Sequence, residues 1–134
     1  MEVAHPPNLD RVTVLRTVRV AAIQATPVIL DAEASVAKAV RLLGEAAEQG
    51  AELAVLPETF VPLYPSNRWA HGAARFSGWD ELWERLWENS VDVPGPVTGR
   101  IAAACADLGF HCAIGVNERE STRPGTLRGG PGHP

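Results

Sequence analysis

The stretch Leu53-Ala-Val-Leu-Pro-Glu-Thr-Phe60 decides the fold of this chain. Its first four residues are apolar and predict a short buried strand. Pro57 ends that strand, because proline has no N–H to donate to a neighbouring strand and favours extended geometry in the residue before it. Glu58 therefore follows at the strand's carboxyl end. Ligands of open α/β sheets bind at that edge, so this carboxylate is either a solvated loop charge or a positioned acid or base.

A strand and a helix are predicted before this stretch. The first strand, Val18 to Ala25, is apolar on both faces for most of its length, which is typical of a covered central strand. The helix runs from Asp31 to Gln49, with Asp31 as its N-cap and Gly50 as the glycine that ends it. Its expected apolar stripe is Val36, Val40, Leu43 and Ala47. Strand, helix and strand with short connections predict a βαβ unit with parallel pairing.

The chain after Glu58 predicts a second step of the same kind. Pro62 to Gly78 is expected to be irregular, and Asp80 to Asn89 to form a short helix. The packing face of that helix is predicted to be a largely aromatic stripe, Trp79, Leu82, Trp83, Leu86 and Trp87. Pro96 to Leu108 predicts another helix, with Val97, Ile101, Ala104 and Leu108 as its buried stripe and Gly109 as its stop. Phe110 to Val116 predicts the third strand, so the fold class is α/β with a mainly parallel sheet.

Three segments are predicted from the composition along the chain. Residues 1–17 are expected to be a flexible leader, and residues 18–120 carry all the patterned sequence. Residues 121–134 contain three prolines and four glycines and show no periodicity. We expect this tail to be irregular and to reflect a truncated or frame-shifted reading of a longer gene.

The overall composition excludes several classes of protein. The 134 residues are 46% hydrophobic and 21% charged, which is typical of a globular domain. The net charge of −4 and the lack of a Lys/Arg cluster argue against nucleic-acid binding, and no apolar run is long enough for a membrane span. Cys105 and Cys112 are too few for a disulfide framework and lack zinc-ligand spacing, and no glycine-rich phosphate motif is present. The N-terminus does not look like a signal peptide, so a cytoplasmic protein is expected.

Several blocks in order resemble one enzyme family. They are Val20-Ala-Ala-Ile-Gln24, the run Leu56-Pro-Glu-Thr-Phe-Val-Pro-Leu-Tyr-Pro65, Val93-Pro-Gly-Pro96 and Gly115-Val-Asn-Glu-Arg119. Together they resemble the nitrilase branch of the carbon–nitrogen hydrolases, over about Arg19 to Arg119. The resemblance implies the N-terminal part of an α-β-β-α sandwich, a homo-oligomer, and hydrolysis of a small nitrile or amide without metal or organic cofactor.

The resemblance also assigns roles to particular residues. Family members use a Glu, a Lys and a Cys, and Glu58 matches the general-base glutamate. Tyr64 matches a pocket-lining aromatic that contacts substrate, or it only braces the loop between two prolines. A carboxylate needs burial to act as a base near neutral pH, since its reference pKa is about 4.3, so Glu58 is expected to be buried beside the strand end.

The lysine and the cysteine of the mechanism have no match in this sequence. Lys38 is the sole lysine and precedes Glu58, whereas the family's lysine follows its glutamate. Cys105 and Cys112 fall in a predicted helix and inside a predicted strand, where cysteines usually serve as small core residues. The chain as given is therefore expected to be inactive.

Two other functions remain open on the sequence alone. An amidase or carbamoylase of the same superfamily would share the glutamate and the fold. A non-enzymatic α/β fragment would instead associate through apolar faces such as the tryptophan stripe. A nucleotide-binding domain is disfavoured, because the glycine loop is missing.

Overall fold

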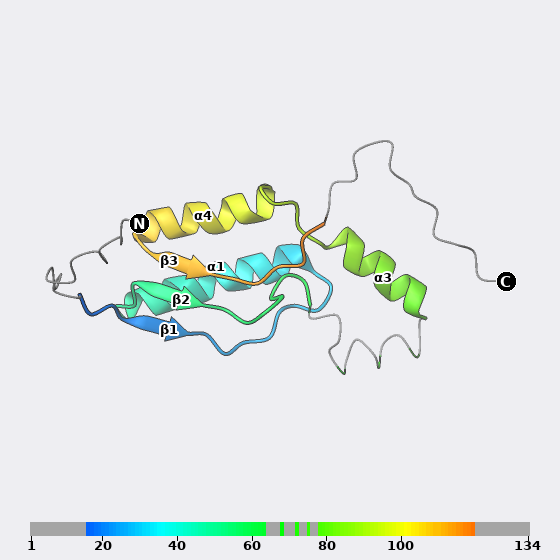
Figure 1. Cartoon of the computed structure of the whole chain (residues 1–134), viewed down its shortest axis with the longest axis horizontal. Coiled ribbons are helices and arrows are strands. Elements are labelled where there is room, and N and C mark those ends of the chain that lie inside the picture. Colours follow the sequence, from blue (N-terminus) through cyan, green and yellow to red (C-terminus); the bar gives the residue numbers. More distant parts are fainter. Residues whose placement is uncertain (1–15, 64–67, 69–71, 73–74, 76–77, 120–134) are drawn as a thin grey trace, which may run out of the picture.

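Three short parallel strands form the sheet around which the chain is built (Figure 1). The computed structural model describes residues 16–63, 68, 72, 75 and 78–119. Strands β1 (Val20–Ala22), β2 (Leu53–Val55) and β3 (His111–Ala113) lie in the order β1-β2-β3. The register aligns Ala21 with Ala54 and Ala54 with Cys112. All three predicted strands are confirmed in position and direction, although each regular strand is shorter than predicted.

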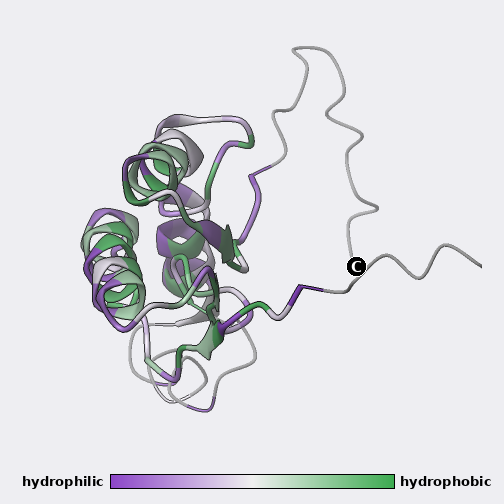
Figure 2. Ribbon diagram, turned by 90° about the vertical axis from the view of Figure 1, so that its left-hand side faces the viewer, coloured by the Kyte–Doolittle hydropathy of each residue, from purple (hydrophilic) through white to green (hydrophobic). Residues whose placement is uncertain are grey.

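Helices α1 (Ala32–Glu48) and α4 (Pro96–Leu108) cover one face of this sheet and pack against each other (Figures 1 and 2). Asp31 caps α1 as predicted, since its Oδ1 accepts a hydrogen bond of 2.8 Å from the backbone N–H of Ala34. Helix α4 ends at Gly109, whose φ of 61° is the left-handed conformation that glycine adopts without strain. The helix boundaries predicted from capping residues are thus confirmed to within one residue.

The main core lies between the sheet and these two helices. Val36, Ala39 and Leu43 of α1 are fully buried and pack with Ala54 of the central strand and with Phe60. In α4, Ile101 is buried, whereas Leu108 is 42% exposed. The predicted stripe of α4 is therefore wrong at its end, because the helix turns Cys105 rather than Leu108 toward the core.

The opposite face of the sheet is not covered by any described segment (Figure 2). Val20 is 51% exposed and Val55 is 43% exposed, and their side chains share this face. Strand β1 pairs only with β2, so among the described residues it is an edge strand. The prediction that β1 is a covered central strand is wrong for the described residues. An apolar sequence shows that a strand can be buried, but it does not show which segment packs over it.

Helix α3 (Trp79–Glu88) lies beyond the carboxyl ends of the strands (Figure 1). Its Leu82 and Leu86 are buried in a small second cluster with Leu30 and Leu63. Trp83 and Trp87, by contrast, are each more than half exposed. The predicted packing face is confirmed at the two leucines. For Trp83 and Trp87 the prediction of packing in the described core is wrong, and contact with another subunit stays a prediction.

Other predictions fall partly outside the described residues. The leader 1–17 is described only at its last two positions, and the tail 121–134 and Tyr64 are not described. Residues 68, 72 and 75 are helical, so the prediction of irregular chain throughout Pro62 to Gly78 is wrong at these positions. Within the described ranges, no helix combines the length and the apolar character that crossing a membrane requires.

Candidate active site at the carboxyl edge of the sheet

Glu58 leaves the sheet at the carboxyl end of β2, as predicted. The backbone N–H of Leu56 still donates to the carbonyl of Ala113 at 2.9 Å, and Pro57 then ends the pairing. Glu58 and Thr59 form the turn that follows. The Glu58 side chain is exposed, so the expectation that it is buried beside the strand end is wrong for the described part of the chain.

A shallow hollow lies directly beside this turn. It has a volume of about 380 Å³ and is lined by the ends of two neighbouring strands, residues 22–24 and 55–57. Gln24 supplies a polar side chain, and the other lining residues are apolar. Glu58 is the next residue after the last lining residue, Pro57. The backbone of Glu58 therefore follows directly from the wall of this hollow, at the edge where parallel sheets bind ligands, although the Glu58 side chain does not line it.

The backbone of this turn is held in an unusual conformation. Thr59 has a φ of 47°, a region that residues other than glycine rarely adopt and that costs about 1–3 kcal/mol. Its Oγ1 is buried and has no hydrogen-bond partner among the described residues. Strain of this kind persists only where surrounding structure enforces it.

Gly115, in the segment after β3, packs directly against this turn. A Cβ atom at this position would lie 2.4 Å from the backbone N of Thr59 and 2.9 Å from the Cα of Glu58. Both contacts are with backbone atoms, which cannot swing away as a side chain could. The backbone of Glu58 therefore lies directly against a glycine, and only glycine allows that approach.

We expect Gly115→Ala to reduce the free energy of unfolding by about 1–3 kcal/mol, because the added methyl group forces the backbone of Glu58 and Thr59 to move. Gly44→Ala is the matched control. Gly44 lies inside α1 with open space around its Cα, so alanine there should increase stability by roughly 0.5–1 kcal/mol. Urea denaturation of the two variants measures both effects. Equal or greater stability of Gly115→Ala would show that the turn does not pack on this glycine.

Asn117 fixes the loop that leads away from Glu58. Its backbone N–H donates to the carbonyl of Val61 at 2.8 Å, and its side-chain Nδ2 donates to the carbonyl of Leu63 at 2.8 Å. Tyr64 is the next residue, but it lies outside the described residues, so its contact with substrate stays a prediction. This role of Asn117 is not among the predictions from the sequence. Its place in the Gly115–Arg119 block is the signal that points to it.

An ion pair between Arg119 and Asp92 holds the C-terminal end of the Gly115–Arg119 block. The Arg119 guanidinium donates two hydrogen bonds, of 3.2 and 2.7 Å, to the two Asp92 carboxylate oxygens. These hydrogen bonds hold the pKa of Asp92 below its usual value. The ion pair therefore stabilises the folded chain at neutral pH, and its contribution is lost as the pH falls through the lowered pKa of Asp92.

The remaining candidate residues do not join Glu58. The Lys38 ammonium donates to the Thr26 carbonyl at 2.8 Å, so it ties α1 to the segment after β1. Cys105 and Cys112 are partly buried on the helix-covered side of the sheet. Burial raises the pKa of both thiols, that of Cys112 to about 11, which keeps them protonated and weakly nucleophilic. Their predicted role as core residues agrees with this environment.

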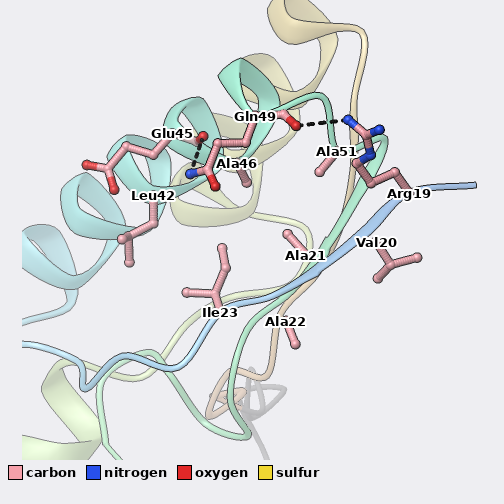
Figure 3. A pocket seen from close by; sticks show the side chains of 10 residues that line it. All are labelled: Arg19, Val20, Ala21, Ala22, Ile23, Leu42, Glu45, Ala46, Gln49 and Ala51. Atoms are coloured by element: carbon pink, nitrogen blue, oxygen red, sulfur yellow. Dashed lines mark hydrogen bonds between the residues drawn. The ribbon is translucent and has the colours of Figure 1, made fainter.

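A second hollow lies away from Glu58. It has a volume of about 400 Å³ and lies between the free edge of β1 and α1, where Ala21 and Ile23 point toward the helix and Arg19 donates to the Gln49 carbonyl (Figure 3). This hollow does not include Glu58. In the described part of the chain, no group of three or more His, Cys, Asp or Glu side chains could hold a metal ion.

Comparison with known proteins decides the family. Residues 19–130 match the family model described as carbon-nitrogen hydrolase. The chain is a carbon–nitrogen hydrolase family member. The match covers the sheet, the helices and the Glu58 turn, and it extends to residue 130, into the segment 121–134 that the composition predicts to be an irregular tail.

Relatives of this carbon–nitrogen hydrolase carry nitrile-related names. The chain is 39% identical over 114 residues to Nitrilase 3 from an unknown prokaryotic organism, covering 84% of this chain and 33% of the relative. It is 36% identical to an aliphatic nitrilase of Rhodococcus rhodochrous, covering 78% of this chain and 28% of the relative. It is 34% identical to a cyanide hydratase of Armillaria gallica, covering 80% of this chain and 29% of the relative. The chain spans about a third or less of the length of these relatives.

Proposed function

We propose that this chain supplies the general base, Glu58, of a nitrile-hydrolysing carbon–nitrogen hydrolase. The observation that carries the proposal is the turn at the end of β2, where Gly115 and the positive φ of Thr59 fix the backbone of Glu58 beside a ligand-sized hollow. The relatives named as nitrilases support the choice of a nitrile over other substrates.

The chemistry requires a thiol and a cation in addition to this base. A nitrile carbon is a weak electrophile, so attack needs a thiolate, and a carboxylate that accepts the thiol proton generates it. A lysine ammonium stabilises the negative charge that builds on the substrate nitrogen. The thiolate adds to the nitrile carbon, a first water displaces ammonia and leaves a thioester, and a second water cleaves that thioester to the carboxylic acid and the free thiol. The same glutamate deprotonates each water.

The cysteine and lysine of this mechanism come from outside the sequence given. Lys38 and the two cysteines are engaged elsewhere in the fold, and the relatives are about three times as long as the matched segment. We propose that the same additional chain covers the open face of the sheet with a second sheet, which completes the α-β-β-α sandwich. It would also bury Glu58, as a base at neutral pH requires. The chain alone is then inactive.

Two alternatives have specific support. A related hydratase, amidase or carbamoylase activity would use the same glutamate, and one of the relatives is named as a cyanide hydratase. A non-enzymatic role in association is favoured by the exposed valines of the uncovered sheet face, Val20 and Val55. Light scattering, which measures the molar mass in solution, tests the association role. A soluble monomer at high concentration would argue against it.

The experiment that tests the proposal is a chimera. Residues 19–119 replace the matching segment of the Rhodococcus rhodochrous aliphatic nitrilase, and ammonia release from an aliphatic nitrile is measured. We expect the folded chimera to release ammonia and the isolated 134-residue chain to release none. Nitrile hydrolysis by the isolated chain would contradict the proposal, as would a folded chimera with an intact catalytic cysteine and no activity.

A further inference from the structure

A groove lies between α3 and the segment after β3, away from the hollow beside Glu58. Its volume is about 550 Å³, and we call it the Trp–Glu groove after the side chains that dominate it, Trp83, Trp87, Glu84 and Glu118. Ser90 and Asn117 also line it. Figure 1 shows the chain after β3 running past the end of α3 that is nearest the sheet.

Trp83 and Trp87 lie outside the buried cluster that packs α3 against the fold. Leu82 and Leu86 anchor the helix and are less than 10% exposed, whereas Trp83 is 53% exposed and Trp87 is 51% exposed. Residues four apart on a helix lie on the same side, so the two indoles lie next to each other along the groove. Aromatic side chains of this size contribute most when covered, and two adjacent exposed tryptophans indicate a surface that a ligand covers.

The charge of the groove selects the kind of ligand. Glu84 and Glu118 take part in no ion pair with another described residue. The Ser90 hydroxyl donates to the Leu86 carbonyl, and the Asn117 amide donates to the Leu63 carbonyl. The two carboxylates are therefore the charged groups of the groove left for a ligand, and they favour a cation.

The same charges argue against a second copy of this chain as the occupant. Helix α3 carries four acidic residues and one basic residue, Asp80, Glu81, Glu84, Glu88 and Arg85. Pairing two such helices through their tryptophan faces would bring like charges together, which opposes association. A ligand of opposite charge has no such penalty.

We infer that the Trp–Glu groove binds an alkylammonium cation. The apolar groups around the charged nitrogen lie against the indole faces, where the ring electrons attract the cation, and Glu84 and Glu118 add Coulombic attraction from either side. This binding does not depend on the catalytic role proposed for Glu58.

Titration of the 134-residue chain with choline tests this inference. The indole N–H resonances of Trp83 and Trp87, assigned with Trp83→Phe and Trp87→Phe, should shift and saturate at millimolar choline, as expected for one or two exposed cation–π contacts. The neutral isostere 3,3-dimethylbutan-1-ol is the ligand control. It has the same shape without the charge and should bind at least about tenfold more weakly.

Matched variants locate the cation site. Glu84→Gln and Glu118→Gln should each weaken choline binding by about three- to tenfold, and Trp83→Leu should abolish the shift of Trp87. Glu81→Gln, on the same helix but outside the groove, should leave the affinity unchanged. Circular dichroism confirms that each variant is folded.

Three results would overturn the inference. The first is the absence of saturable shifts up to about 100 mM choline, an affinity too weak for a cation–π site. The second is equal affinity for choline and its neutral isostere, which would make the groove merely apolar. The third is self-association in sedimentation that Trp83→Leu abolishes, which would assign the groove to a second copy of the chain.

Discussion

Replacing Phe60 with alanine is expected to reduce the free energy of unfolding by about 3–5 kcal/mol. Phe60 is fully buried in the cluster between the sheet and the two covering helices. It is also the second residue after Glu58, so its burial anchors the turn in the core. Gly115, in the segment after β3, packs against the backbone of the same turn. Removing the ring leaves a cavity that the short strands cannot close. A loss of this size is a large fraction of the stability of a small domain.

Urea denaturation followed by circular dichroism measures this loss, with Leu108→Ala as the matched control. Leu108 is also apolar but is 42% exposed at the end of α4, so its replacement should change stability by less than about 0.5 kcal/mol. Phe60→Leu keeps much of the buried volume and should fall between the two. Equal unfolding midpoints for Phe60→Ala and Leu108→Ala would show that the Glu58 turn is not anchored in the core.

Local signals in the sequence were sufficient to predict the elements and their order. Asp31, Gly50 and Gly109 marked helix ends correctly, because capping and left-handed conformations depend on neighbouring residues. The position of Glu58 at a strand's carboxyl end followed from an apolar run stopped by Pro57. These inferences needed no knowledge of distant contacts.

Contacts between distant segments account for what the sequence did not reveal. The exposure of Val20 depends on what covers the sheet, and apolar pattern alone cannot identify the cover. The exposure of Trp83 and Trp87 also depends on distant contacts, because it is Leu82 and Leu86 that pack α3 against Leu30 and Leu63. The approach of Gly115 to Glu58 joins two residues far apart in the chain, so no local pattern predicts it.

The exposed Glu58 has a consequence for how the site would be completed. A carboxylate in water is a weak base at neutral pH, and burial is the usual way to strengthen it. The described fold fixes the backbone that carries Glu58 but leaves its side chain open. One part of the family domain would then position the backbone of Glu58, and another part would bury its side chain and so make it a stronger base.

The most direct test of the base is Glu58→Gln in the chimera that carries residues 19–119 within the Rhodococcus rhodochrous nitrilase. Glutamine keeps the size of the side chain and its hydrogen-bonding reach but cannot accept the thiol proton. General-base catalysis typically contributes 10²–10⁴-fold, so kcat/KM for nitrile hydrolysis should fall by at least about a hundredfold.

Glu48→Gln, an exposed substitution at the end of α1, is the matched control and should leave kcat/KM within about a factor of two. Thermal unfolding of both variants establishes that any difference is not a loss of folding. A hundredfold loss confined to Glu58→Gln is the predicted result. Equal kcat/KM in the Glu58→Gln and Glu48→Gln chimeras would contradict the assignment of Glu58 as the general base.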